Sequence, residues 1–166
     1  MARPQVRPTL YSKILTMTKF AFAITPFALL LPFITHASEA DCVIPQTQAV
    51  TALFERWNAS LQTGDSSKVA DNYATGAVLL PTLSDQPRLE RAQKIEYFDK
   101  FLKNKPVGTV NTRKVFVSCN NAVDTGTYTF KFADNSSVSA RFTFTYTWQD
   151  NQWLITTHHS SAMPAS

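Results

Sequence analysis

The chain has 166 residues, of which 16 are Lys or Arg and 12 are Asp or Glu, giving a formal net charge of +4. Four of the basic residues and none of the acidic ones fall within residues 1–37, so the rest of the chain carries 12 of each sign. A domain of balanced charge lacks the basic surface that attracts nucleic acid, and no nucleic-acid partner is expected.

The first 37 residues have the pattern of a cleavable secretory signal. A stretch with basic charges only precedes residues 20–37, which are uncharged and largely apolar. This stretch contains two prolines and is shorter than the ~20 apolar residues of a membrane-spanning helix. Cleavage is expected after Ala37 or Ala40, and translation could begin at Met1 or Met17. The sequence therefore predicts export to the periplasm or the medium, with no membrane attachment once the signal is cleaved.

Residues 38–166 have the length of one domain with its own core. The two cysteines, Cys42 and Cys119, both fall in this part. Since an exported protein meets an oxidising compartment, a disulfide between them is predicted; two buried free thiols are the alternative.

The first half of this domain has helical patterns. Apolar residues recur at steps of three and four over residues 46–62, and Asp65 is placed to cap a second helix that extends through Tyr73. A short apolar strand is expected at 77–80, and a third helix at 89–103.

From Gly108 onwards the apolar period changes to two, which predicts strands at 109–118, 122–133, 138–149 and 152–161. The short turns between them favour an antiparallel meander. The order of elements predicts an α+β domain in which three N-terminal helices pack on one face of a strongly curved antiparallel sheet.

Several candidate site residues lie on the last two predicted strands. In residues 141–148 the aromatic side chains alternate with Arg141 and three threonines, so one face is aromatic and the other polar. The aromatic face is either core or the wall of a ligand cavity. Arg141 could pair with Asp124 or receive an anionic ligand.

His158 and His159 are neighbours on a strand and must point to opposite faces. Strict alternation places His158 with Leu154 and His159 with Ile155. Either histidine could act as an acid or base or could simply bond to nearby backbone or serine groups. No cluster of metal-ligating residues is visible, and neither a metal nor another cofactor is expected.

Three segments carry a resemblance to a known family: LFERWNASLQTGDSSKVADNYATGAVLLPT, YFDKFL and RFTFTYTWQDNQWLITTHHSSAMP. Together they resemble the association domain of calcium/calmodulin-dependent protein kinase II, and more closely the free-standing bacterial proteins that carry this domain without a kinase. The resemblance spans Thr47 to Pro164. It implies the cone-shaped nuclear transport factor 2-like fold, self-association and a cavity. Other members of that superfamily, such as the ketosteroid isomerases and SnoaL-like cyclases, use the cavity for acid/base catalysis.

Two hypotheses follow. The first is an exported, self-associating, non-catalytic domain that forms a dimer or larger ring and holds a small, largely apolar ligand. The second is a small-molecule isomerase, cyclase or hydratase with His158 as general acid or base, positioned by a tyrosine. The candidate ligand-binding residues are Trp57, Tyr73, Tyr97, Tyr128, Phe144, Tyr146 and His158.

Overall fold

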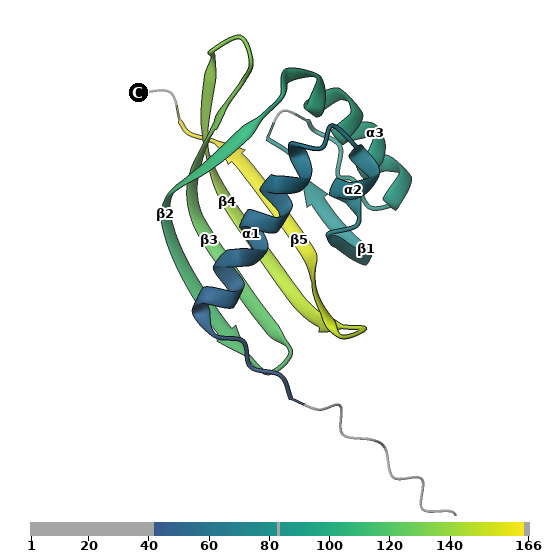
Figure 1. Ribbon diagram of the computed structural model, residues 1–166, viewed down its shortest axis with the longest axis vertical. Helices are drawn as coiled ribbons and strands as arrows, with labels where there is room; N and C mark the ends of the chain where they lie inside the picture. The colour runs from purple at the N-terminus through teal and green to yellow at the C-terminus, as the bar shows by residue number, and fades with distance from the viewer. Residues whose placement is uncertain (1–41, 83, 165–166) are drawn as a thin grey trace, which may run out of the picture. The chain divides into compact units, whose positions relative to one another are not determined.

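The computed structural model describes residues 42–82 and 84–164, so the predicted signal at 1–37 and its cleavage sites lie outside the described residues. Figure 1 shows the elements in chain order: α1 (Thr47–Leu61), α2 (Ser66–Ala70), β1 (Tyr73–Leu80), α3 (Arg91–Phe101), the 3₁₀ turn η1 (Leu102–Asn104), β2 (Val107–Ser118), β3 (Asn121–Lys131), β4 (Ser137–Gln149) and β5 (Gln152–Ala162). None of the helices in this described part has the length and apolar character needed to cross a bilayer.

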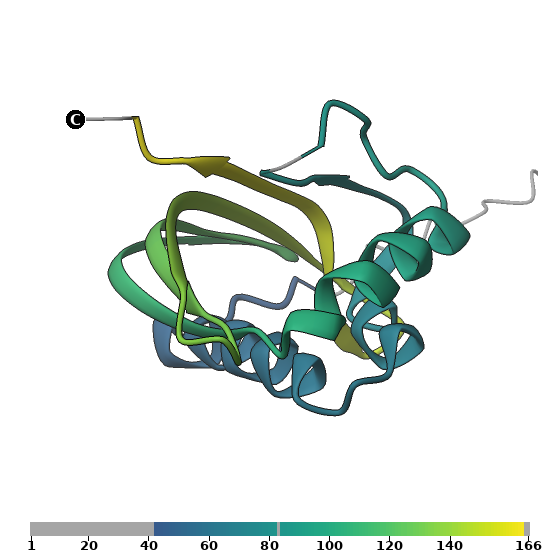
Figure 2. The same cartoon turned by 90° about the horizontal axis from the view of Figure 1, so that it is seen from above.

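The strands form one sheet in the order β1-β5-β4-β3-β2. Strands β2 to β5 pair antiparallel, as predicted, and curl around one side of the domain in Figure 2. The exception to the antiparallel pattern is β1, which joins β5 in parallel. The α+β class, with helices covering one face of a curved sheet, is confirmed.

Helix α1 lies across the concave face of the sheet (Figure 1). Its buried residues recur every three or four positions, which gives the helix a continuous apolar stripe: Val50, Leu53, Phe54, Trp57 and Leu61. Against this stripe pack the inward aromatic side chains of β3 and β4, including Tyr128, Phe142 and Phe144, each at most 2% exposed. The core is therefore largely aromatic.

The second helix is shorter than predicted. It begins where expected, because the Asp65 carboxylate accepts hydrogen bonds from the backbone N–H groups of Ser67 and Lys68. It ends at Ala70 because the Asn72 side-chain amide donates to the carbonyls of Lys68 and Val69. Tyr73 consequently begins β1 instead of ending a helix.

Strands β2 and β3 approach each other closely next to an irregularity in their pairing. The pairing shifts register between Val110 and Thr112, and Gly126 of β3 pairs with Arg113, the next residue of β2. A Cβ atom at Gly126 would lie 1.9 Å from the carbonyl oxygen of Thr112, so only glycine fits this approach.

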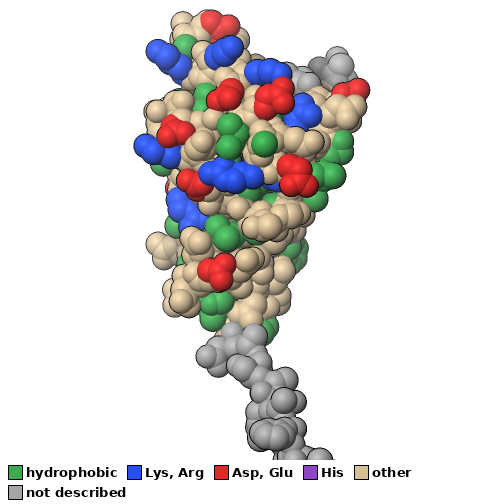
Figure 3. All heavy atoms as spheres, turned by 90° about the vertical axis from the view of Figure 1, so that its right-hand side faces the viewer, with side chains coloured by type: hydrophobic (Ala, Val, Ile, Leu, Met, Phe, Trp, Pro, Cys, Tyr) green, Lys and Arg blue, Asp and Glu red, His purple; other side chains and the backbone are tan. Residues whose placement is uncertain are grey.

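The helical side of the domain carries both signs of charge. Figure 3 shows Lys and Arg side chains interspersed with Asp and Glu on this face. This mixture agrees with the balanced charge of residues 38–166.

The predicted disulfide between Cys42 and Cys119 is present, with the two Cα atoms 5.0 Å apart. Next to it, the Val43 N–H donates to the Asn120 side-chain oxygen at 2.8 Å, and the Asn120 N–H donates to the Val43 carbonyl at 2.9 Å. The segment before α1 is thereby fastened to the β2–β3 turn.

Removing this disulfide should destabilise the domain, because the bond closes a loop spanning a sequence separation of 77 residues. Replacing both cysteines with serine should lower the free energy of unfolding by about 2–4 kcal/mol. Guanidinium denaturation of the two proteins measures the difference, and the reductant dithiothreitol should lower the stability of the parent protein only. Equal stabilities would contradict this expectation.

Candidate functional site

A cavity of about 80 Å³ opens between α3 and the inner face of the sheet. Its walls are contributed by α1, α3, β3, β4, β5 and the end of β1. They comprise Trp57, Leu79, Thr82, Tyr97, Phe98, Phe101, Tyr128, Phe130, Phe132, Val138, Ala140, His158 and Ser160. None of these side chains carries a permanent charge.

One wall of the cavity is aromatic. Trp57 meets Phe98 and Phe130 edge to face, with ring centroids 6.3 and 6.2 Å apart, and Phe101 meets Phe130 at 5.4 Å. Such contacts fix ring orientation in addition to burying apolar area. This wall offers a rigid apolar surface to a ligand.

Hydroxyl groups gather on another part of the wall. The Tyr128 hydroxyl donates to Ser160 Oγ at 2.6 Å, and the Thr82 hydroxyl also contacts Ser160 Oγ. The three hydroxyl groups carry three protons, and the two hydrogen bonds among them use two of these. The third proton, on Thr82 or Ser160, is therefore free to donate to a ligand or water. Tyr128 lies at the buried end of this chain, and Thr82 is half-buried.

His158 is a buried polar residue of the cavity wall, with 4% of its surface exposed. Its Nδ1 lies 2.9 Å from the Tyr73 hydroxyl, which also accepts a hydrogen bond from Trp57 Nε1 at 3.1 Å. Its ring stacks on Phe144 with centroids 3.9 Å apart. Its Nε2 has no hydrogen-bond partner among the described residues.

Burial keeps the ionisable groups of the cavity neutral. It lowers the pKa of His158 to about 3, with a smaller effect from nearby His159. It raises the pKa of Tyr97 to about 12 and raises those of Tyr128 and Tyr73 as well. Near neutral pH the site therefore presents neutral hydroxyl and imidazole groups.

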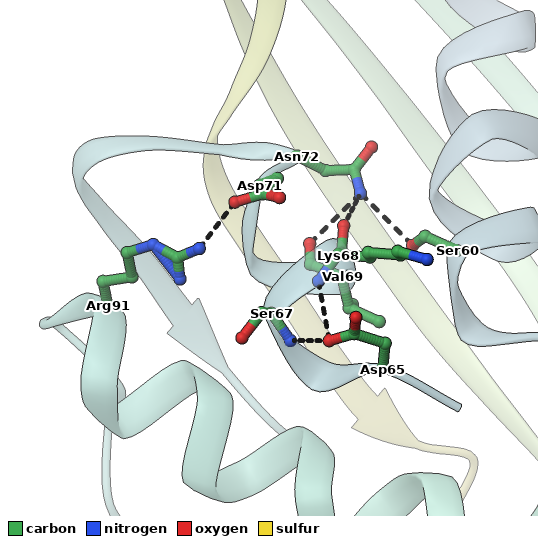
Figure 4. A network of polar contacts seen from close by, with 8 residues as sticks. All are labelled: Ser60, Asp65, Ser67, Lys68, Val69, Asp71, Asn72 and Arg91. Carbon is green, nitrogen blue, oxygen red and sulfur yellow. Dashed lines mark hydrogen bonds and ion pairs between the residues drawn. The ribbon is translucent and has the colours of Figure 1, made fainter. Parts of the chain in front are cut away.

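Tyr73 reaches His158 because the residue before it is firmly held. Figure 4 shows the Asn72 amide between the end of α1, where it bonds Ser60 Oγ, and the carbonyls of α2. The Asn72 carbonyl also accepts the N–H of Ile155, on the strand that carries His158. In the same view Arg91 of α3 pairs with Asp71 at 2.6 Å.

The comparisons with known proteins agree with this architecture. The sequence profile of the calcium/calmodulin dependent protein kinase II association domain matches residues 46–164. The chain belongs to this association domain family.

A structure from Xanthomonas campestris, assigned to the same association domain, is 47% identical, with a TM-score of 0.71 over 74% of this chain and 91% of that one. An iota-carbonic anhydrase from a cyanobacterium, in complex with bicarbonate, is 17% identical, with a TM-score of 0.67 over 74% and 95% of the two chains. A protein from Streptomyces avermitilis, assigned as a dehydratase of the nuclear transport factor 2-like family, is 12% identical, with a TM-score of 0.64 over 71% and 96%. The last two show a shared fold alone. The comparison with curated proteins gives no match.

The association domain brings four of the seven candidate ligand-binding residues into the cavity wall: Trp57, Tyr97, Tyr128 and His158. The other three, Tyr73, Phe144 and Tyr146, lie outside the lining. Tyr73 and Phe144 contact His158 from outside the cavity lining. The Tyr146 hydroxyl has no hydrogen-bond partner in the described part of the chain. Thr82 was not a candidate, because the residues after Pro81 have only the composition of a loop.

The predicted alternation of β5 needs a correction. Phe144 faces His158 across the strands, whereas Tyr146 faces Ile155, so Thr156 is an extra residue in a β-bulge. Since Phe144 and Tyr146 share a face, His158 lies on the side of Ile155. His159 is exposed on the opposite face, as predicted for two neighbouring residues of a strand.

Asp124 pairs with Arg113 and not with Arg141, which was its expected partner. Its carboxylate, fully buried, forms an ion pair with Arg113 of β2 at 3.0 Å, and Arg141 is exposed on the outer face. Burial raises the pKa of Asp124 even though Arg113 opposes the shift. Across residues 42–82 and 84–164, no three His, Cys, Asp or Glu side chains are grouped to hold a metal.

The buried His158 should make stability depend on pH. Its pKa is 6.5 in its ordinary state and about 3 in the fold, so the unfolded chain binds more protons between these values. The free energy of unfolding should therefore fall as the pH falls from 6.5 towards 3, by up to ~1.4 kcal/mol per pH unit from this residue.

The matched pair His158→Gln and His159→Gln isolates this effect. Urea denaturation between pH 7 and pH 4 should show the pH slope reduced in H158Q and retained in H159Q. Parallel slopes in H158Q and the parent protein would show that His158 does not titrate in this way.

Proposed function

We propose that this association domain catalyses the reversible hydration of carbon dioxide in its cavity. The observation that carries the proposal is the size and lining of the cavity. About 80 Å³ accommodates a molecule of a few heavy atoms, far below the ~300–1,000 Å³ of sites for larger organic ligands. This favours a hydratase over an isomerase or cyclase acting on ring systems.

The lining suits both sides of this reaction. Carbon dioxide is apolar and matches the wall of Trp57, Phe98 and Phe130. Water and the developing bicarbonate need hydrogen-bond partners, which the Thr82–Ser160–Tyr128 hydroxyls and His158 supply. Prearranged donors at the oxygen that gains charge are a strong source of rate enhancement. The cyanobacterial structure with bicarbonate adds support from a protein of the same fold.

The proposed step balances without a further reactant. The water oxygen forms a bond to the carbon, and one C=O π pair moves onto the oxygen that the donors face. The water proton passes to the hydroxyl oxygen of Thr82 or Ser160, whose own proton moves on to solvent. The product is an anion in a cavity without a positive side chain, so its release is favoured.

Stopped-flow measurement of carbon dioxide hydration with a pH indicator tests the proposal. The protein should accelerate hydration above the buffer rate, and Ser160→Ala should lower kcat by about a hundredfold. Ser161→Ala is the matched control, because Ser161 is the adjacent residue on the outer face. A parent protein with no acceleration, or equal losses in both variants, would contradict the proposal.

Self-association is a second proposed property, supported by membership of an association domain family. The outer face of the sheet is the surface that we propose for it. None of the helices in residues 42–82 and 84–164 covers this face. It carries exposed Arg141 among threonines paired across the strands, such as Thr125 with Thr143 at 2.9 Å. Export also remains a proposal, and the Cys42–Cys119 disulfide is compatible with it.

Light scattering coupled to size-exclusion chromatography tests the association. The parent protein should form a dimer or larger assembly, and Arg141→Glu should shift it towards monomer because it reverses the charge of a side chain in the proposed contact. A parent protein that is monomeric at micromolar concentration would rule out self-association under those conditions.

A further inference from the structure

Three side chains behind the cavity form a hydrogen-bonded row that ends at His158. Trp57 Nε1 can only donate, and it donates to the Tyr73 hydroxyl oxygen at 3.1 Å. The Tyr73 hydroxyl lies 2.9 Å from His158 Nδ1. All three residues are at most 8% exposed, so water has little access to them. The position of each proton is therefore decided within the row.

The hydrogen bonds of the row favour one tautomer of His158. If Tyr73 donates to Nδ1, both hydrogen bonds of the row form and the ring proton is on Nε2. If Nδ1 carries the proton instead, the Tyr73 oxygen accepts twice and its own proton has no acceptor among the described residues. The first arrangement leaves the Nε2 proton without a partner among the described residues, whereas the second leaves both the Tyr73 proton and the Nε2 lone pair unpaired. Unpaired buried polar groups are unfavourable, so the first arrangement is the stable one.

The orientation of the ring is fixed as well. Phe144 stacks against one of its faces, and Trp57 meets it at an interplanar angle of 84°. Tyr73 is outside the cavity lining and His158 is within it, which favours the ring edge away from Tyr73 as the one that borders the cavity. That edge carries Nε2, which has no partner in the described chain.

We propose that Tyr73 is a positioning residue, which holds neutral His158 with its proton on Nε2 so that the imidazole presents an N–H donor to the cavity. The chemical role of that donor rests on the hydration proposed above: it stabilises the oxygen that gains charge as water attacks carbon dioxide. His158 is then not the base that receives the water proton, which leaves that task to the hydroxyls of Thr82 and Ser160.

The tautomer can be measured directly. Long-range ¹H–¹⁵N correlation spectra of protein labelled with ¹⁵N-histidine, at pH 7, distinguish protonated from unprotonated ring nitrogens, and the signals that are lost in His158→Gln are those of His158. A protonated Nε2 and an unprotonated Nδ1 are expected. Tyr73→Phe should increase the fraction protonated at Nδ1, because it removes the donor to that nitrogen.

Tyr146→Phe is the matched control for loss of a buried hydroxyl, since that hydroxyl has no hydrogen bond to His158. It should leave the His158 signals in place. A protonated Nδ1 in the parent protein would overturn the proposal, and so would a Y73F spectrum identical to that of the parent. The parent spectrum decides the tautomer even if Y73F fails to fold.

The role of the donor has its own test. Adding bicarbonate should shift the Nε2 resonance of His158 more than Nδ1, and Y73F should lower kcat for hydration by at least about tenfold. Unchanged Nε2 and unchanged kcat would overturn the role. A parent protein without hydration activity would overturn the proposed function, whereas the spectra would still decide whether Tyr73 sets the tautomer.

Discussion

The arrangement of this domain depends on the joint at Asn72 and Tyr73, where α2 ends and β1 begins. The buried Asn72 amide ends α2, and its oxygen accepts Arg56 Nε at 3.1 Å. Its backbone carbonyl accepts the N–H of Ile155 on β5. Two helices and a strand are therefore held at one residue, and the next side chain is directed inwards to His158. Because each polar group of Asn72 is paired inside the fold, weakening one contact exposes the others to loss.

Burial also determines which chemistry is available. An aromatic interior penalises charge, so the histidine and tyrosines at the cavity remain neutral and act through hydrogen bonds. Among the described residues the buried ion pair is that of Arg113 with Asp124, and it lies outside the cavity lining. The charged pair packs against α1, with the Arg113 guanidinium 5.4 Å from the centroid of the Phe54 ring. The domain thus keeps this pair apart from the neutral site.

Much of this structure could be predicted from the sequence because it follows from local periodicity. The apolar steps of α1, the alternation of β4 and the pairing of Cys42 with Cys119 all follow from patterns within the chain. The bulge at Thr156 does not, since register depends on what the neighbouring strand places opposite. Nor does the end of α2, which a single amide from Asn72 decides. Thr82 could not be found because its position in the cavity comes from its contact with Ser160, 78 residues away.

The order His-His-Ser-Ser in β5 has a consequence for evolution. His158 and Ser160 face inwards, while His159 and Ser161 repeat the same pair on the outer face. If an insertion or deletion moved this strand by one residue, an imidazole and a hydroxyl at the same spacing would again enter the cavity. The motif therefore tolerates a kind of mutation that would remove the polar groups of most strands.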